Sequence, residues 1–208
     1  MDRILKEIDL KYLDSLIMNV KRKRFKYSII DETSTEIVYL RTLSSLSFDI
    51  HKCGLMGDFR RQKYKIKIQA NLRKGTKNYL RIINLNNKAK KIESFVNGVV
   101  DVLFLAFYED DIRYLFPFSS NGNPYPTYIY VTRYKEGMVL EEYMVQSNQI
   151  IYEKYNKQDE IKTLYFRVNY VPNGKHKILD YEKGVFENNS FINYTLLEYR
   201  SWLDELSE

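Results

Sequence analysis

The chain has 208 residues, 44% of them apolar, which is enough to bury one or two hydrophobic cores. Its net charge of +6 is compatible with nucleic-acid binding, and the single cysteine, Cys53, excludes an intrachain disulfide and a cysteine-based metal site. There is no run of about eighteen apolar residues and no secretory signal, so we expect a soluble, cytoplasmic protein with no membrane partner.

A first helix is predicted from Asp9, an acidic N-cap residue that precedes apolar residues at helical spacing. The helix ends in four consecutive cations, which are Lys21, Arg22, Lys23 and Arg24. Such a run is typical of a solvated helix end, because positive charge is favourable at the carbonyl end of the helix dipole. The same four residues are candidate DNA contacts.

A second helix is predicted near Thr33. Thr33 and Glu36 have the spacing of a capping box, in which each side chain bonds the backbone of the other. A buried stripe of this helix would consist of Ile37, Leu40 and Leu43.

A hairpin is predicted after the second helix. Apolar and polar residues alternate over 46–50, which predicts a strand. A short strand and a tight turn in 53–61 would then lead back into a strand at 62–71. The last strand alternates apolar and polar residues, which is the period-two pattern of a half-buried strand. The cations on or just after its polar face are Lys63, Lys65, Lys67, Arg73 and Lys74.

The lysine face of this strand has two interpretations. Ammonium groups on alternate residues of a strand lie about 7 Å apart and repel one another, so they need contact with either water or anionic groups. The face is therefore either a solvated outer surface or a surface that contacts phosphate groups.

Further strands are predicted at Tyr79–Leu85, 99–108 and 112–118, with an acidic turn at 109–111. The turn-rich segment 119–126 is the best candidate for a domain boundary. Four strand-like runs follow it, at 128–133, 138–145, 164–171 and 177–181, and the chain should end in a helix over 192–206. We therefore predict a core at 1–118 and a β-rich extension at 119–208, packed on the core.

From about residue 35 to 118 the layout resembles the PD-(D/E)xK nuclease superfamily, in its compact homing-endonuclease and Holliday-junction-resolvase branch. The similar features are a helix with Glu36 near its start, a strand at 48–50, a hairpin strand at 64–69 and a closing pair of strands. The resemblance implies an α+β fold, with a restriction-endonuclease-type α/β/α core whose mixed sheet is flanked by helices. It also implies self-association, because small nucleases of this type commonly form oligomers.

The signature residues of the family are substituted. The family's first carboxylate falls on Gly54, its second ligand position on Lys67 and its lysine on Gln69. In the family these residues hold Mg²⁺ and position the attacking water. A lysine beside a dication would be repelled, so the metal site implied by the resemblance is expected to be degenerate. Glu36 and Asp58 are the nearest candidate replacements, although the patterns also fit a helix cap and a turn residue.

Other catalytic arrangements have less support. The two histidines, His51 and His176, lie far apart and have no metal-ligand spacing. We interpret them as surface or partly packed side chains.

Three functional hypotheses remain. The first is a DNA-binding protein with an endonuclease-like fold, no cofactor, and double-stranded or branched DNA as its partner. The second is an active Mg²⁺-dependent endonuclease, with Glu36, Asp58, Lys67 and Gln69 as its catalytic residues. The third is a protein-interaction or inhibitor module built on a nuclease-like scaffold. The lysine row favours the first, because it keeps the electrostatic requirement for DNA where carboxylates are missing.

Overall fold

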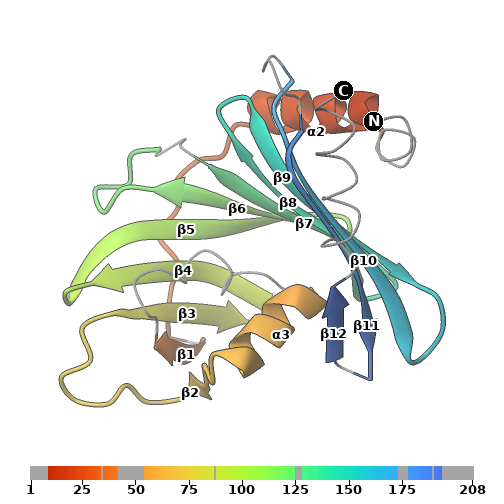
Figure 1. Cartoon of the computed structure of the whole chain (residues 1–208). Coiled ribbons are helices and arrows are strands. Elements are labelled where there is room, and N and C mark those ends of the chain that lie inside the picture. Colours follow the sequence, from red (N-terminus) through yellow and green to blue (C-terminus); the bar gives the residue numbers. More distant parts are fainter. Residues whose placement is uncertain are drawn as a thin grey trace.

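The computed structural model describes residues 9–33, 35–41, 54–86, 88–124, 128–172, 178–188 and 190–193. These ranges form one antiparallel sheet of twelve strands and two helices (Figure 1). The helices are α2 (Leu10–Arg22) and α3 (Leu55–Lys63). The strands are β1 (Glu36–Arg41), β2 (Ile68–Gln69), β3 (Tyr79–Leu85), β4 (Lys88–Val96), β5 (Val99–Glu109), β6 (Ile112–Phe118), β7 (Ile129–Lys135), β8 (Met138–Gln146), β9 (Gln149–Lys157), β10 (Lys162–Tyr170), β11 (Ile178–Glu187) and β12 (Ser190–Asn193).

The sheet is a meander in which strands β3 to β11 each pair with the next strand along the chain. Its order is β12-β11-β10-β9-β8-β7-β6-β5-β4-β3-β1-β2, so β12 and β2 are the two edges. Six of the hairpins have two-residue loops whose first residue has a positive φ, the backbone that matches the right-handed twist of the flanking strands. These residues are Asn86, Asn97, Asp110, Glu136, Ser147 and Asn188.

Helix α2 covers one face of the sheet and confirms the helix predicted from Asp9. The Asp9 carboxylate accepts the backbone N–H of Tyr12 at 2.9 Å, which caps the helix. The buried side of α2 packs on alternate residues of β5 to β10, because period-two side chains of a strand point to one face. That buried side consists of Leu13, Leu16, Ile17 and Val20.

Helix α3 lies on the opposite face, between β1–β3 and β11–β12 (Figure 1). Its Met56 packs with Tyr155, Tyr165 and Phe186 of β9, β10 and β11. A few residues after the helix, Ile66 packs against Leu40 and Leu80 of β1 and β3. The segment 55–66 therefore connects two flanks of the sheet whose strands do not pair directly with one another.

A row of polar side chains crosses the face beneath α3. Registered pairs place Thr132, Glu142 and Glu153 side by side on β7, β8 and β9, and all three are buried. Thr132 donates to Glu142 at 3.2 Å, and the Tyr155 hydroxyl donates to Glu153 at 3.2 Å. The backbone N–H of Gly54, just before α3, donates to Glu142 at 2.9 Å, so the row anchors the start of this helix.

The predicted fold class and the resemblance to the PD-(D/E)xK superfamily are wrong. That core needs a mixed sheet flanked by helices, whereas every strand pair here is antiparallel and the described residues hold only the helices α2 and α3. The resemblance relied on the order of a few short elements, which an antiparallel meander can imitate over a limited stretch.

The second predicted helix is also wrong, because Glu36–Arg41 is the strand β1. Thr33 bonds to Asp31 through both its backbone N–H and its hydroxyl, and Glu36 begins the strand instead of completing a capping box. The spacing of Ile37 and Leu40 fits a helix, but the β-branched and aromatic residues between them pack well in a sheet.

The hairpin predicted over 53–71 and its lysine-faced strand are wrong as well, and the strand predicted at 46–50 lies outside the described residues. Residues 55–63 are helical, a turn follows, and only Ile68 and Gln69 are in a strand, where they pair with Leu40 and Tyr39. The three lysines therefore lie on a helix end, a turn and the approach to β2, and not on one strand face.

Most of the later strands are confirmed. Strands β3 and β6 have the predicted bounds, and β5, β7, β8, β10 and β11 overlap their predicted runs. Strands β4, β9 and β12 were not predicted. β6 and β7 pair across the proposed boundary at residue 118, and the division into two domains stays a prediction.

Two further expectations concern the C-terminal helix and the absence of a membrane-spanning helix. Residues 194–206 of the predicted C-terminal helix lie outside the described residues, and Ile192 is in β12. Neither α2 nor α3, the helices of the described ranges, is long and apolar enough to cross a membrane.

Candidate nucleic-acid interface

Positive charge is concentrated in one continuous stretch of the chain. From Phe59 to Ile92 there is no acidic residue, and the stretch holds twelve of the 33 lysines and arginines. The remaining 21 basic residues are outnumbered by the 27 acidic ones, so the whole positive excess comes from this stretch. This signal was available from the sequence, but the strand interpretation drew attention to five of its cations only.

Several of these cations form ion pairs with carboxylates of the protein. The Arg81 guanidinium pairs with Glu93 at 2.8 Å and with Glu32 at 2.5 Å, and the Lys91 ammonium pairs with Glu93 at 2.8 Å. The two carboxylates raise the pKa of Arg81 further above its usual range, although burial opposes this. Arg61 pairs with Asp58 at 2.6 Å. These side chains stabilise the sheet and α3.

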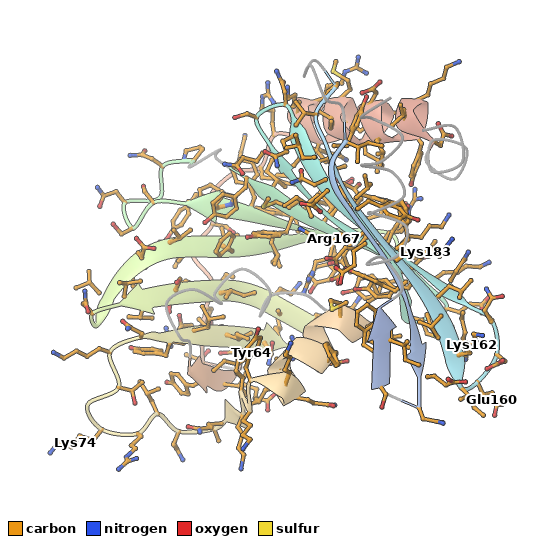
Figure 2. All side chains as sticks on the ribbon, in the orientation of Figure 1. Tyr64, Lys74, Glu160, Lys162, Arg167 and Lys183 are labelled. Carbon is orange, nitrogen blue, oxygen red and sulfur yellow. The ribbon has the colours of Figure 1, made fainter. Side chains whose placement is uncertain are left out.

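Six other cations are exposed and lie together at one corner of the molecule. They begin at the end of α3 and continue through the turn, β2 and the loop before β3, where Lys74 extends away from the sheet (Figure 2). Among the described residues, no carboxylate lies within ion-pairing distance of any of them. We call this group the cationic edge; it consists of Lys63, Lys65, Lys67, Arg73, Lys74 and Lys77.

The backbone at the end of α3 fixes the direction of the cationic edge. The N–H of Ile66 bonds to the carbonyl of Arg61 at 2.8 Å and the N–H of Lys65 bonds to that of Gln62 at 3.0 Å, which is a Schellman motif. Lys65 occupies its left-handed position with φ 53°, where glycine is usual. This reversal sends the chain to the outer edge of β1.

Two apolar side chains lie exposed among these cations. Tyr64 is 42% exposed and Ile68 is 64% exposed. The Lys63 ammonium lies 5.8 Å from the centre of the Tyr64 ring, a cation–π contact. An exposed aromatic ring beside cations can stack on a nucleic-acid base.

The structure does not gather the predicted catalytic residues into a metal site. Glu36 is exposed at the start of β1, Asp58 bonds Arg61 on α3, and Gln69 pairs with Tyr39. Within the described ranges, no group of three or more histidine, cysteine, aspartate or glutamate residues could hold a metal ion. His51, Cys53 and His176 lie outside those ranges.

The four cations at the end of α2 are separate from the cationic edge. Figure 1 shows α2 and β2 at opposite ends of the view. Lys21 bonds to Asn148, Lys23 pairs with Glu109, and Arg24 bonds to backbone carbonyls of the same turn. These four residues stay candidate DNA contacts, but at a different place on the surface.

Comparison with known proteins gives no relative: no family model, no curated protein and no solved structure matches this chain.

Proposed function

We propose that this protein binds nucleic acid through the cationic edge, contacting the phosphate backbone of double-stranded or branched DNA without cleaving it. The observation that carries the proposal is the group of six exposed cations on a stretch of 34 residues that has no acidic side chain. Phosphates are spaced so that several cations on one surface can contact them at once, and each contact releases a counterion.

The edge position of β2 supports a contact with an extended partner. One side of β2 faces away from the sheet, and the loop at 70–78 extends past β3. Exposed cations at a sheet edge suit the backbone of an extended polyanion better than a small ligand. The cytoplasmic location expected from the sequence stays a prediction, and it would bring such a surface into contact with nucleic acid.

The test is the salt dependence of binding to a short DNA duplex. Six phosphate contacts predict that log K falls with log salt with a slope of about −5, measured by fluorescence anisotropy between about 50 and 200 mM salt. Lys67→Gln and Lys74→Gln should each reduce the slope by about 1. Lys135→Gln, at an exposed position of the β7–β8 hairpin, is the matched control and should leave the slope unchanged.

Three results would contradict the proposal. A shallow slope with weak binding would leave the protein-interaction module as the better hypothesis. Equal affinity for polyglutamate would mean that any polyanion is accepted. Cleavage of the duplex that requires Mg²⁺ and is lost in Asp58→Ala would make the protein a nuclease.

Lysines at a sheet edge also prevent one sheet from pairing with another. If Lys67→Gln leaves the DNA affinity unchanged but causes association in sedimentation velocity, edge protection is the role of this lysine.

A further inference from the structure

A pocket of about 390 Å³ lies between the first turn of α2 and the strands β9, β10 and β11. Sites for small molecules have volumes of this order. The pocket is on the face of the sheet covered by α2, and none of the residues that line it belongs to the cationic edge.

Aromatic rings form much of the lining. Tyr12 of α2, Tyr152 of β9 and Phe166 of β10 all line the pocket, and each ring meets the next edge to face, with centroids 6.2 and 6.4 Å apart. A planar ring can pack on such a surface by the same geometry.

The hydroxyl groups of Tyr12 and Tyr152 are hydrogen-bonded to a buried carboxylate beside the pocket. Tyr12 and Tyr152 donate to the two oxygens of Glu141 at 2.6 and 2.5 Å, and Arg133 donates to the same carboxylate at 2.8 Å. Burial and the bond to Glu141 raise the pKa of Tyr12 to about 12, so its proton stays in place at neutral pH. What these tyrosines offer a ligand is therefore ring surface.

Two lysines flank the phenylalanine. Phe166 pairs with Lys154 on β9 and with Lys183 on β11, so the three side chains point to the same face of the sheet (Lys183 is labelled in Figure 2). No described carboxylate is within ion-pairing distance of Lys154. Asp9 is the only acidic residue in the described lining, and its carboxylate caps α2 through the N–H of Tyr12.

We propose that this pocket binds a small aromatic anion, with its ring against Tyr12 and Phe166 and its anionic group beside Lys154. The amide of Asn156, which also lines the pocket, can add a hydrogen bond to the same group. A neutral aromatic molecule would use the rings alone, and a simple inorganic anion would use Lys154 alone.

The test uses two dyes that differ by one sulfonate. 8-Anilinonaphthalene-1-sulfonate is an aromatic anion, and N-phenyl-1-naphthylamine is its neutral counterpart. In fluorescence titrations of the full chain, Lys154→Gln should lower the affinity for the anionic dye about threefold to fivefold. It should change the affinity for the neutral dye by less than about twofold. Phe166→Ala should weaken both dyes.

Lys157→Gln is the control, because Lys157 is exposed on β9 and does not line the pocket. Circular dichroism of each variant shows whether it folds, and Lys154 is exposed enough to be replaced without loss of core packing. Equal loss of both dyes in Lys154→Gln, or no loss of the anionic dye, would overturn the assignment of an anion site. Binding of the anionic dye that survives Phe166→Ala in a folded protein would place the dye elsewhere.

Discussion

At the scale of single residues, Lys65 is the cation whose position is hardest to explain by stability. It has a left-handed backbone at the position of a Schellman motif that glycine usually occupies. An L-residue there is less favourable than glycine by about 1 kcal/mol. Lys65→Gly should therefore raise the free energy of unfolding by about 1 kcal/mol in urea denaturation while it weakens binding to duplex DNA.

Ser147→Gly is the matched control for that experiment. Ser147 has φ 49° in the exposed β8–β9 turn, so the substitution relieves the same backbone conformation without removing a cation. It should stabilise the protein to a similar degree and leave DNA affinity unchanged. Weaker DNA binding in both variants would show that backbone flexibility, and not the Lys65 charge, is responsible.

The hydroxyl of Tyr12 makes stability depend on pH in the alkaline range. Burial and the bond to Glu141 raise the pKa of this hydroxyl from about 10 in the unfolded chain to about 12 in the folded protein. Below about pH 10 the contribution is fully present; between these two values the unfolded state loses the proton first, so the free energy of unfolding falls as pH rises.

Tyr12→Phe removes this hydroxyl and keeps the ring. At about pH 8 the variant should be less stable by about 1–2 kcal/mol, because the buried Glu141 loses a donor. The difference from the unmodified protein should shrink between about pH 10 and pH 12, as measured by urea unfolding at several pH values. A difference that stays constant across this range would mean that Tyr12 titrates alike in both states.

At the scale of elements, α2 is held to the sheet by one side of the helix. Ile17 is 3% exposed and the next residue, Met18, is 49% exposed. Ile17→Ala should lower the free energy of unfolding by about 2–4 kcal/mol, because it leaves a cavity against β5–β10. Met18→Ala should change it by less than about 0.5 kcal/mol. Similar losses in both variants would contradict the packing of α2 described here.

The sequence predicts the elements whose signals are local. Strands β3 and β6 could be predicted because short apolar runs are bounded by turn residues, and α2 because Asp9 precedes a clear apolar stripe. Strand β4 could not, since Lys91 is acceptable within the sheet only because Glu93 and Glu32 neutralise it, and Glu32 comes from a distant segment. The whole of α3 was missed, and its end gave no signal because Lys65 stands where glycine would mark a helix terminus.

Only part of the candidate site could be predicted, because its local charge pattern is visible in the sequence and its spatial arrangement is not. The cations of 63–74 are visible as a charge pattern, but the strand inferred for them was wrong, and Lys77 joins them only through the loop before β3. The pocket beside α2 had no local signal, because Lys154 and Lys183 become neighbours of Phe166 only through strand register.

At the scale of the whole molecule, the segment 55–66 joins flanks of the sheet that are far apart in strand order. Met56 packs with residues of β9, β10 and β11, and Ile66 packs with β1 and β3. Met56→Ala should lower the free energy of unfolding by about 2–4 kcal/mol and Ile66→Ala by less, since Ile66 is only half-buried.

Hydrogen exchange followed by mass spectrometry should separate the two contacts. Met56→Ala should speed exchange mainly in β9–β12, and Ile66→Ala mainly in β1 and β3, because each removes the link to one flank only. Tyr64→Ala is the control, since Tyr64 lies between the two contacts and is 42% exposed. If both core variants speed exchange uniformly in all strands, the sheet opens as one unit and the segment 55–66 does not stabilise the two flanks separately. If each acts on its own flank, the segment that holds the two flanks together also contains Lys63 and Lys65, the first two residues of the cationic edge.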